Sequence, residues 1–334
     1  MPSSALLRLA DPSEWQHVVR GADVRVTVTR HGVFNAELSR VQMHRLVMLR
    51  GWQSLPSVAR IGVHKSRNAI FFLTKPDQAP TTLGGIELPP GDIVFPADGS
   101  EFYNRGNGNA RWGAMSLTPE DLAAYGRAIV GRELAAPQVT RVVRPQHDLM
   151  SRLVKLQKAA ADLAAAAPNI LAHPEVANAI EQELVRLMIT CLADPQVEES
   201  GRALRLGPTV MRRFEQLLDA HPREPLHITE VCAAIGVTDR MLRIYCQDHL
   251  GMSPHQYLWR RRLHLVRRAL ALSDPAATTV TEIANNYGFG ELGRFAVSYR
   301  KIYGEPPSAT LRRPPDHRQS LGITRSGSAV SGFA

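Results

Sequence analysis

Two arginines, Arg240 and Arg243, stand three residues apart in the half of the chain that carries most of its excess positive charge. A guanidinium is a planar group with five N–H donors, and it can bind phosphate oxygens or the O6 and N7 atoms of guanine through paired hydrogen bonds. Residues 207–334 hold 17 basic and 11 acidic side chains, a net charge of +6, against 23 and 20, a net charge of +3, in residues 1–206. This concentration of positive charge favours a polyanionic partner.

Side chains that could build an enzyme or a metal site are scattered. His31, His44 and His64 lie 13 and 20 residues apart and form no His-x-His pair. The three cysteines of the chain form no Cys-x-x-Cys pair, which zinc sites and redox sites commonly use. The sequence contains no GxSxG, GxxxxGK or HExxH motif, the signatures of a nucleophile elbow, a phosphate loop and a zinc protease. We therefore expect no enzyme activity, no bound metal and no cofactor.

An internal repeat surrounds the two arginines. Residues 228–237 align with residues 280–289 at an offset of 52, and after one inserted residue 250–254 align with 303–307. Each copy has the pattern of a short helix, a tight turn and a second helix, with Gly236 and Gly288 where the first helix must stop. Glycine is favoured at such a position because it adopts positive φ without strain. The pattern is that of the helix-turn-helix, whose second helix enters the major groove of DNA.

The spacing of the two copies is compatible with one DNA site. A helix predicted over residues 254–272 joins them, and its 19 residues span about 28 Å at the rise of an α-helix. Successive major-groove segments on one side of B-DNA lie about 34 Å apart. One chain can therefore place both second helices in adjacent major-groove segments if the DNA bends somewhat.

Residues 210–313 resemble the DNA-binding domain of AraC/XylS-type transcriptional regulators. The residues that carry the resemblance are Leu250-Gly251-Met252-Ser253-Pro254, Val280-Thr281-Glu282-Ile283-Ala284, Tyr287-Gly288-Phe289, Phe295, Tyr299-Arg300-Lys301 and Gly304-Glu305-Pro306-Pro307-Ser308. The resemblance implies a sequence-specific regulator with two helix-turn-helix units per subunit. It often also implies an N-terminal effector or dimerisation domain with a cupin-like barrel.

Base-contacting residues follow from the two second helices, which we expect over residues 238–249 and 291–303. In the first helix the candidates are Thr238, Asp239, Arg240, Arg243 and Ile244, the last at a position where the family often has a basic residue. In the second helix they are Leu292, Gly293, Val297 and the neighbouring Arg294. Because only Arg294 among these can make paired hydrogen bonds, we expect the second unit to discriminate bases less. Candidates for phosphate contacts are Arg260, Arg261, Arg267, Arg300 and Lys301.

The N-terminal half has a different pattern. Residues 24–118 contain short apolar or alternating runs separated by turn residues, which is typical of a small antiparallel sandwich or barrel. Helical periodicity takes over across 119–193. Combined with the family resemblance, the expected fold is α+β, with an N-terminal cupin-like antiparallel β barrel, flanking helices and an all-α C-terminal domain. Four aromatic residues, Trp52, Phe72, Phe95 and Trp112, are candidates to line an effector pocket, with plain core packing as the alternative.

Composition shifts suggest the domain boundaries. We expect an effector-sensing or dimerisation domain over 1–200, a linker over 194–209, a DNA-binding domain over 210–313 and a disordered tail over 314–334. No apolar run approaches the roughly 18 residues of a membrane-spanning helix, and the N-terminus has no secretory pattern. With only three cysteines, these features favour the reducing cytoplasm.

The function predicted from the sequence is an effector-responsive transcriptional activator. Its expected partners are double-stranded promoter DNA, RNA polymerase, an unknown small-molecule effector and, as a possibility left open, a second copy of the chain. One alternative is an architectural or constitutive DNA-binding protein without an effector. A remote alternative is a cupin-type enzyme fused to a DNA-binding domain.

Overall fold

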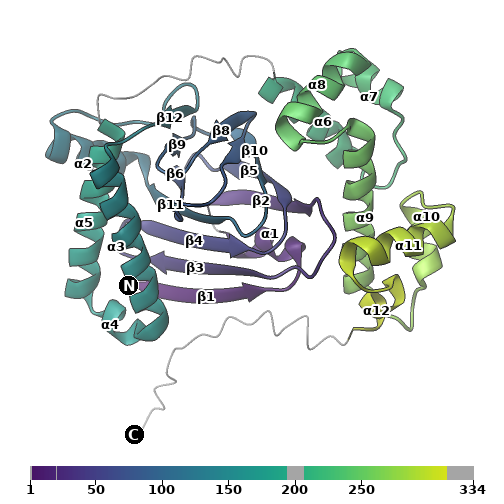
Figure 1. Cartoon of the computed structure of the whole chain (residues 1–334), viewed down its shortest axis with the longest axis horizontal. Coiled ribbons are helices and arrows are strands. Elements are labelled where there is room, and N and C mark those ends of the chain that lie inside the picture. The colour runs from purple at the N-terminus through teal and green to yellow at the C-terminus, as the bar shows by residue number, and fades with distance from the viewer. Residues whose placement is uncertain (1, 20, 194–206, 314–334) are drawn as a thin grey trace, which may run out of the picture.

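The computed structural model describes residues 2–19, 21–193 and 207–313. The predicted tail over 314–334 lies outside these residues, as does the predicted linker over 194–209 except where helix α6 begins at Gly207. Figure 1 shows a strand-rich N-terminal part, flanked on one side by long helices and on the other by the helical C-terminal part. Among the described residues no helix is long and apolar enough to cross a membrane.

Two antiparallel sheets form the centre of the N-terminal part. The larger sheet has the order β1-β3-β4-β11-β6-β9-β12 and the smaller one the order β2-β5-β10-β7-β8. The strands of the larger sheet are β1 (Ser3–Leu9), β3 (Ala36–Gln42), β4 (Val47–Gln53), β6 (Asn68–Leu73), β9 (Ile93–Phe95), β11 (Arg111–Leu117) and β12 (Arg141–Val143). Those of the smaller sheet are β2 (Ala22–Val28), β5 (Ser57–Val63), β7 (Thr81–Leu83), β8 (Ile86–Leu88) and β10 (Glu101–Gly106).

The sheets stack face to face and do not close into a barrel. Their facing sides share one apolar core, to which the larger sheet contributes Leu38 and Leu49 and the smaller one Val26 and Ile61. In the described part of the chain, no strand of one sheet pairs with a strand of the other. The predicted cupin-like barrel is therefore wrong, and the sandwich alternative describes the fold. In the described residues the terminal strands β1 and β12 of the larger sheet and β2 and β8 of the smaller one each pair on one side alone, so both sheets end in open edges.

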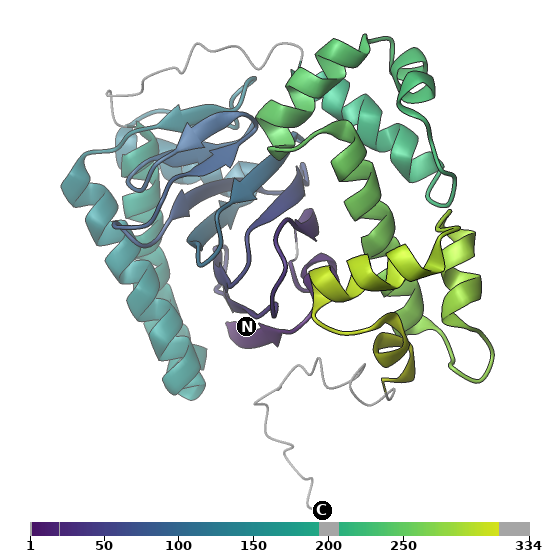
Figure 2. The ribbon, with the colours of Figure 1, turned by 45° about the vertical axis from the view of Figure 1, so that its right-hand side comes forward.

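Helices cover the outer face of the larger sheet. They are α2 (Pro119–Val130), α3 (His147–Ala166), α4 (Pro168–Ala172) and α5 (Pro174–Ala193), while a short segment, η1 (Pro12–Glu14) with α1 (Trp15–Val18), packs beside β2. The apolar stripes of α3 and α5 bury Leu153, Leu184 and Met188 against Met48 and Met115 of the sheet. Figure 2 shows these helices on the side of the sandwich away from the C-terminal part. The helical periodicity of this stretch is confirmed, although β12 interrupts it.

The C-terminal part consists of seven described helices and has two cores. The helices are α6 (Gly207–Ala220), α7 (Ile228–Ile235), α8 (Asp239–Leu250), α9 (Pro254–Leu272), α10 (Val280–Asn286), α11 (Leu292–Tyr303) and α12 (Pro307–Arg312). One core gathers α6, α7, α8 and the start of α9, and the other gathers the rest of α9 with α10, α11 and α12. The linking helix α9 has the bounds that the sequence predicts, and it joins the two units (Figure 2).

Candidate nucleic-acid interface

The first helix-turn-helix is built by α7, a tight turn and α8. The backbone N–H of His227 donates to the carboxylate of Glu230 at 3.1 Å, which caps the start of α7. Gly236 ends α7 with a φ of +72°, and its N–H donates to the carbonyl of Cys232. The Thr238 hydroxyl then accepts from the N–H of Met241 and caps α8. Leu242 and Cys246 face the core of the unit, so α8 has its opposite face in solvent.

The exposed face of α8 carries the predicted base-contacting residues. Arg240 and Arg243 are exposed near its N-terminal end, and Ile244 is 49% exposed. The Arg243 guanidinium lies 2.8 Å from the Asp239 carboxylate one turn away. Asp239 therefore forms an exposed ion pair with Arg243, and Thr238 serves as the helix cap. Burial raises the pKa of the Cys246 thiol to about 12, so this cysteine is a neutral core group.

The second helix-turn-helix has the same arrangement of helices and turn but different side chains on its exposed face. Gly288, with a φ of +75°, follows α10, and α11 packs Phe295 and Tyr299 into its core. Val297 is 69% exposed, and Arg294 is exposed and paired with Glu291 at 3.0 Å. A Cβ added at Gly293 would meet no atom within 4 Å, so Gly293 leaves an open surface. Leu292 is half-buried against the core.

The candidates for phosphate contacts divide into two groups. Arg300 and Lys301 are exposed in the last turn of α11. By contrast, Arg260 donates to the carbonyl of Val28 at 3.3 Å, Arg261 pairs with Asp219, and Arg267 lies 2.6 Å from Asp11. In this arrangement Arg261 and Arg267 are not available to a phosphate, because carboxylates of other segments occupy their guanidinium groups.

A buried polar cluster joins the first unit to the smaller sheet. The Glu215 carboxylate on α6 accepts from the Tyr103 hydroxyl at 2.9 Å and the Tyr257 hydroxyl at 2.5 Å, and it lies 3.4 Å from Arg60 of β5. One turn further along α6, Asp219 binds Arg60 at 2.9 Å. Burial raises the pKa of both tyrosines, as does the negative charge of Glu215, so they stay neutral donors. Sequence reasoning missed this cluster, although two acids four residues apart on an amphipathic helix were a visible signal.

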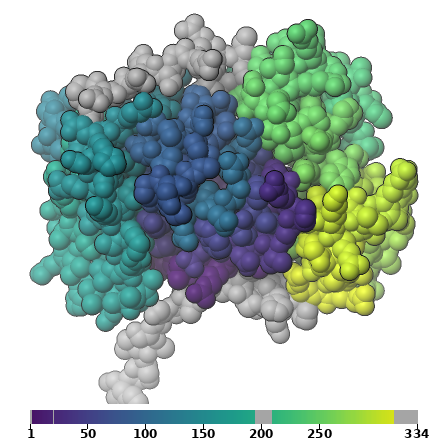
Figure 3. All heavy atoms as spheres, in the orientation of Figure 1, coloured from purple at the N-terminus to yellow at the C-terminus, as the bar shows by residue number. Residues whose placement is uncertain are grey.

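A second cluster joins the segment before α1 to the second unit. Arg267 lies 2.6 Å from Asp11 and 3.5 Å from Glu305, with its guanidinium carbon 4.4 Å from the centre of the Tyr303 ring. Burial raises the pKa of Asp11, but the charges of Arg267 and His264 outweigh that effect and lower it to about 2. This ion pair is therefore fully charged at neutral pH. Figure 3 shows the two units along one edge of the molecule, beside the N-terminal part.

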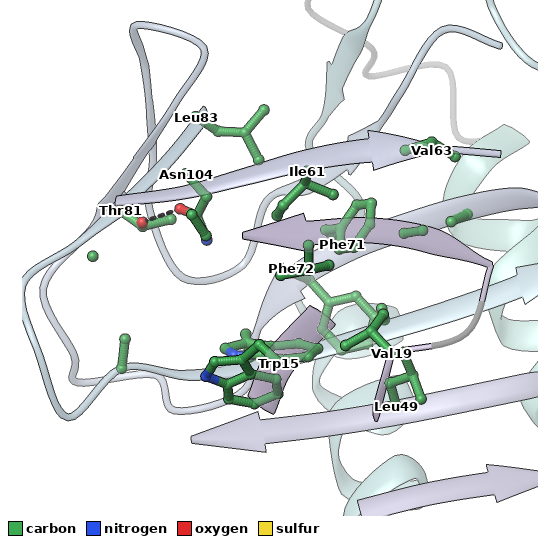
Figure 4. Close-up of a pocket in the computed structure, with 18 of the residues that line it drawn as sticks. Trp15, Val19, Leu49, Ile61, Val63, Phe71, Phe72, Thr81, Leu83 and Asn104 are labelled. Atoms are coloured by element: carbon green, nitrogen blue, oxygen red, sulfur yellow. Dashed lines mark hydrogen bonds between the residues drawn. The ribbon is translucent and has the colours of Figure 1, made fainter. Parts of the chain in front are cut away.

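The candidate effector-pocket aromatics do not gather at one place. A cavity of about 110 Å³ lies inside the sandwich, and both Phe72 and Trp112 are among the residues that line it. Figure 4 shows Phe72 at this cavity. Trp52 lies apart from it, with the Arg111 guanidinium stacked 5.7 Å from its ring centre. Phe95 packs into the core beneath the helices, to which Phe72 also belongs, and it does not line the cavity. Trp15, which the sequence did not single out, also lines the cavity.

These features define a protein with two helix-turn-helix units docked on a β-sandwich domain. A family model described as a helix-turn-helix domain matches residues 231–313. The chain is 38% identical over 108 residues to the probable thc operon regulatory protein of Rhodococcus erythropolis, across 32% of each chain. It is 31% identical over 105 residues to the XylDLEGF operon transcriptional activator 2 of Pseudomonas putida, across 31% of this chain and 67% of that protein.

The chain belongs to the AraC/XylS family of helix-turn-helix proteins, as its C-terminal part predicted. The match spans about a third of the length of the first of these relatives. Among solved structures, the chain is similar to the AraC-like transcriptional activator CuxR, with a TM-score of 0.40, 16% identity and coverage of 78% of this chain and 94% of that one. It is also similar to ToxT of Vibrio cholerae, with a TM-score of 0.30, 8% identity and coverage of 93% and 96%.

Proposed function

We propose that this protein is a sequence-specific transcriptional activator that binds promoter DNA through both helix-turn-helix units. The observation that carries the proposal is the repeat itself: α8 and α11 each expose one face and are joined by the single helix α9. The operon activators among its relatives support the same function. As a promoter-binding protein it would act in the cytoplasm and contact RNA polymerase.

In this proposal the first unit reads bases. Arg240 and Arg243 reach guanine edges from the exposed N-terminal end of α8, where helices of this kind enter the major groove. Ile244 offers an exposed apolar side chain to a thymine methyl group. Thr238 caps the start of this helix, and Asp239 forms an exposed ion pair with Arg243.

The second unit supplies affinity more than sequence discrimination. Of its exposed candidates, only Arg294 can make paired hydrogen bonds with a base, and it lies beside Glu291. Val297 and the open surface at Gly293 fit the shape of a groove without a donor or acceptor. Arg300 and Lys301 are exposed and suited to phosphates.

We further propose that the N-terminal domain, residues 1–200, is an effector domain coupled to the DNA-binding domain, residues 210–313. The smaller sheet supports this proposal, because one of its faces lines the cavity and the other contacts the DNA-binding domain. On β5, Ala59 and Ile61 line the cavity, while the intervening Arg60 binds Glu215 and Asp219 of α6. One layer of backbone therefore separates the cavity from the first helix-turn-helix, and a ligand that shifts β5 also shifts Arg60.

The test is a selection of DNA fragments by the full-length protein, followed by fluorescence anisotropy with the enriched sequence and a scrambled control. We expect one enriched motif, binding that resists scrambled competitor, and a steep loss of affinity with salt as counterions are released. The double variant Arg240→Ala/Arg243→Ala should lose the preference, whereas Arg8→Ala, on the exposed surface of β1, should keep it. Equal affinity for both DNAs would favour an architectural DNA-binding protein.

A further inference from the structure

A cleft at the boundary between the two domains is lined by arginines. It holds about 520 Å³, within the size range of small-molecule sites. One side is formed by the loop after β2 and by the end of β10, and the other by the turn between α8 and α9 and the first two turns of α9. Three arginines from these segments line the cleft, namely Arg30, Arg105 and Arg260.

The cleft has no negative charge to compensate these arginines. No Asp or Glu is among the described residues that line it, and none of the three arginines is paired with a carboxylate in the described part of the chain. Elsewhere along the same boundary arginines are paired, as Arg60 is with Glu215 and Arg267 is with Asp11. Three positive charges therefore share one cleft without the carboxylates that accompany these other arginines.

The two half-buried arginines of the cleft retain donors for a ligand. Arg105 donates to the carbonyl of Gln247 at 3.4 Å and to the Thr82 hydroxyl at 3.1 Å. Arg260 donates to the carbonyl of Val28 at 3.3 Å. A guanidinium has five N–H donors, so most of them remain for an anion. Burial lowers the pKa of Arg260, because removing a charge from water without a counterion is unfavourable, and an anion in the cleft would offset this penalty.

Arg105 reaches across the boundary from the N-terminal domain to the first unit. A Cβ added at Gly251 would lie 2.3 Å from the Nη1 atom of Arg105, so the guanidinium lies directly against the turn between α8 and α9. Gly251 ends α8 with a φ of +68° and leaves the space that the guanidinium occupies. An anion in the cleft would therefore contact the N-terminal domain through Arg30 and Arg105 and the DNA-binding domain through Arg260.

The lining of the cleft favours a phosphate group over other anions. A phosphate ester carries a charge of about −1.5 to −2 at neutral pH and three strong acceptor oxygens, whereas a carboxylate carries one charge. Guanidinium groups bind phosphate oxygens through paired, charge-assisted hydrogen bonds. Further polar side chains also line the cleft, namely Thr29, Asn107 and Gln256. They suit a ligand whose body is polar as well.

We propose that a phosphate-bearing small molecule binds in this cleft and holds the first helix-turn-helix unit against the N-terminal domain. Without an anion the three positive charges repel one another across the boundary. With an anion they are compensated, so binding favours the docked arrangement of the domains. The site lies outside the sandwich, and it goes beyond the proposed function because it makes the contact between the domains depend on a second ligand.

The position of the cleft favours a free molecule over the backbone of bound DNA. Leu250 and Gly251, which line it, stand at the C-terminal end of α8. The arginines proposed to read bases, Arg240 and Arg243, stand near the N-terminal end. The 12 residues of α8 span about 18 Å, which separates the cleft from the end that enters the major groove.

The test titrates the full-length protein with pyrophosphate in a calorimeter, at constant ionic strength and without DNA. We expect submillimolar binding of pyrophosphate and about tenfold weaker binding of acetate. Arg260→Ala should weaken pyrophosphate binding about tenfold, and Arg30→Ala, at an exposed position, provides a second variant if the first does not fold. Arg268→Ala removes the same charge from an exposed position of α9 and should bind as the natural protein does. No binding of pyrophosphate, equal binding of acetate, or equal loss in the Arg268 variant would each overturn the proposal.

Hydrogen exchange of the natural protein tests whether the ligand joins the domains. Pyrophosphate should slow amide exchange about threefold or more both in the loop that contains Arg30 and in the turn that contains Gly251. Slower exchange on one side of the cleft alone would contradict the bridging role.

DNA binding separates the two sources of phosphate. In the absence of pyrophosphate, the double variant Arg30→Ala/Arg105→Ala should bind the selected DNA with the affinity and the salt dependence of the natural protein. A uniform loss of affinity across sequences, with a salt slope lowered by about 2, would place the DNA backbone in the cleft and overturn the proposal. The calorimetric and exchange measurements contain no DNA, so their failure would leave the DNA-binding proposal standing.

Discussion

The two helix-turn-helix units share a sequence pattern but differ in how they are held. The core of the first unit continues into the N-terminal domain, since Val58 of β5 and Tyr103 of β10 belong to it. The core of the second unit contains residues of the C-terminal part alone. Its polar connection to the N-terminal domain runs through Asp11 and Arg267. Repetition of a motif therefore does not imply repetition of its environment.

The two units also differ in the chemistry of the side chains that they expose. The first exposes Arg240 and Arg243, which can distinguish bases, and the second exposes Val297 and the surface at Gly293. The unit suited to read sequence is thus the one whose core is shared with the cavity-bearing domain. The following predictions test the difference, beginning with the largest effect.

Removal of the Glu215 carboxylate should have the largest effect. Glu215→Ala leaves the hydroxyls of Tyr103 and Tyr257 and part of Arg60 buried without their acceptor. Loss of one partner from a buried polar cluster costs about 3–5 kcal/mol of stability. Urea unfolding measures this cost. Arg8→Ala is the control, because the exposed pair of Arg8 with Glu37 is worth less than about 1 kcal/mol. Similar stabilities for the two variants would show that the buried cluster around Glu215 does not stabilise the contact between the first unit and the N-terminal domain.

Glu14 lies beside Asp11 in the segment before α1 that binds the second unit, and it should make the free energy of unfolding depend on pH. Burial and the charge of Asp11 raise the pKa of Glu14 to about 7, so the folded protein keeps a proton that the unfolded chain releases near pH 4.5. Stability should then fall as pH rises from about 4.5 to about 7, by up to about 3 kcal/mol, and level off above that range.

Glu14→Gln isolates this contribution, because an amide does not titrate and other groups contribute equally in both proteins. Urea unfolding at pH 5 and pH 8 should show the variant gaining stability relative to the natural protein at the higher pH. The expectation is wrong if the difference between the two proteins is the same at both pH values.

Removal of an arginine side chain from the exposed face of α8 should change the preference for particular DNA sequences. Arg240→Ala or Arg243→Ala should each cost about 1–3 kcal/mol of discrimination, or roughly 5- to 150-fold, at the base that the arginine contacts. Anisotropy with single-base variants of the selected site measures this. A uniform loss across all sequences would instead assign the arginine to a phosphate.

Removal of a side chain from the exposed face of α11, in the second unit, should have the smallest effect on sequence preference. Arg300→Ala should weaken binding to matched and scrambled DNA alike and lower the salt slope by about 1. Val297→Ala should change base preference less than either first-unit variant. The comparison between the units fails if Val297→Ala relaxes specificity more than Arg240→Ala.

Much of the DNA-binding domain was determined by local sequence. The repeat and the glycines at 236 and 288 predict the helices and turns that the structure shows, and the joining helix over 254–272 lies where it was expected between the two copies. These signals act over a few residues, through backbone conformation and the period of the helix. The alternation of the N-terminal strands likewise predicted antiparallel sheets, but it is the same in a sandwich and a barrel, so it did not decide closure.

Tertiary structure alone decided how side chains of the same kind are used. Arg261 and Arg267 are candidates for phosphate contacts by sequence, yet they form ion pairs with Asp219 and Asp11, and Asp11 lies 256 residues away in the sequence from Arg267. Phe72 lines the cavity and Phe95 does not, although both stand in short apolar strands. Sequence periodicity assigns a residue to a buried or an exposed face. The partner across that face comes from distant segments, and only folding brings them together.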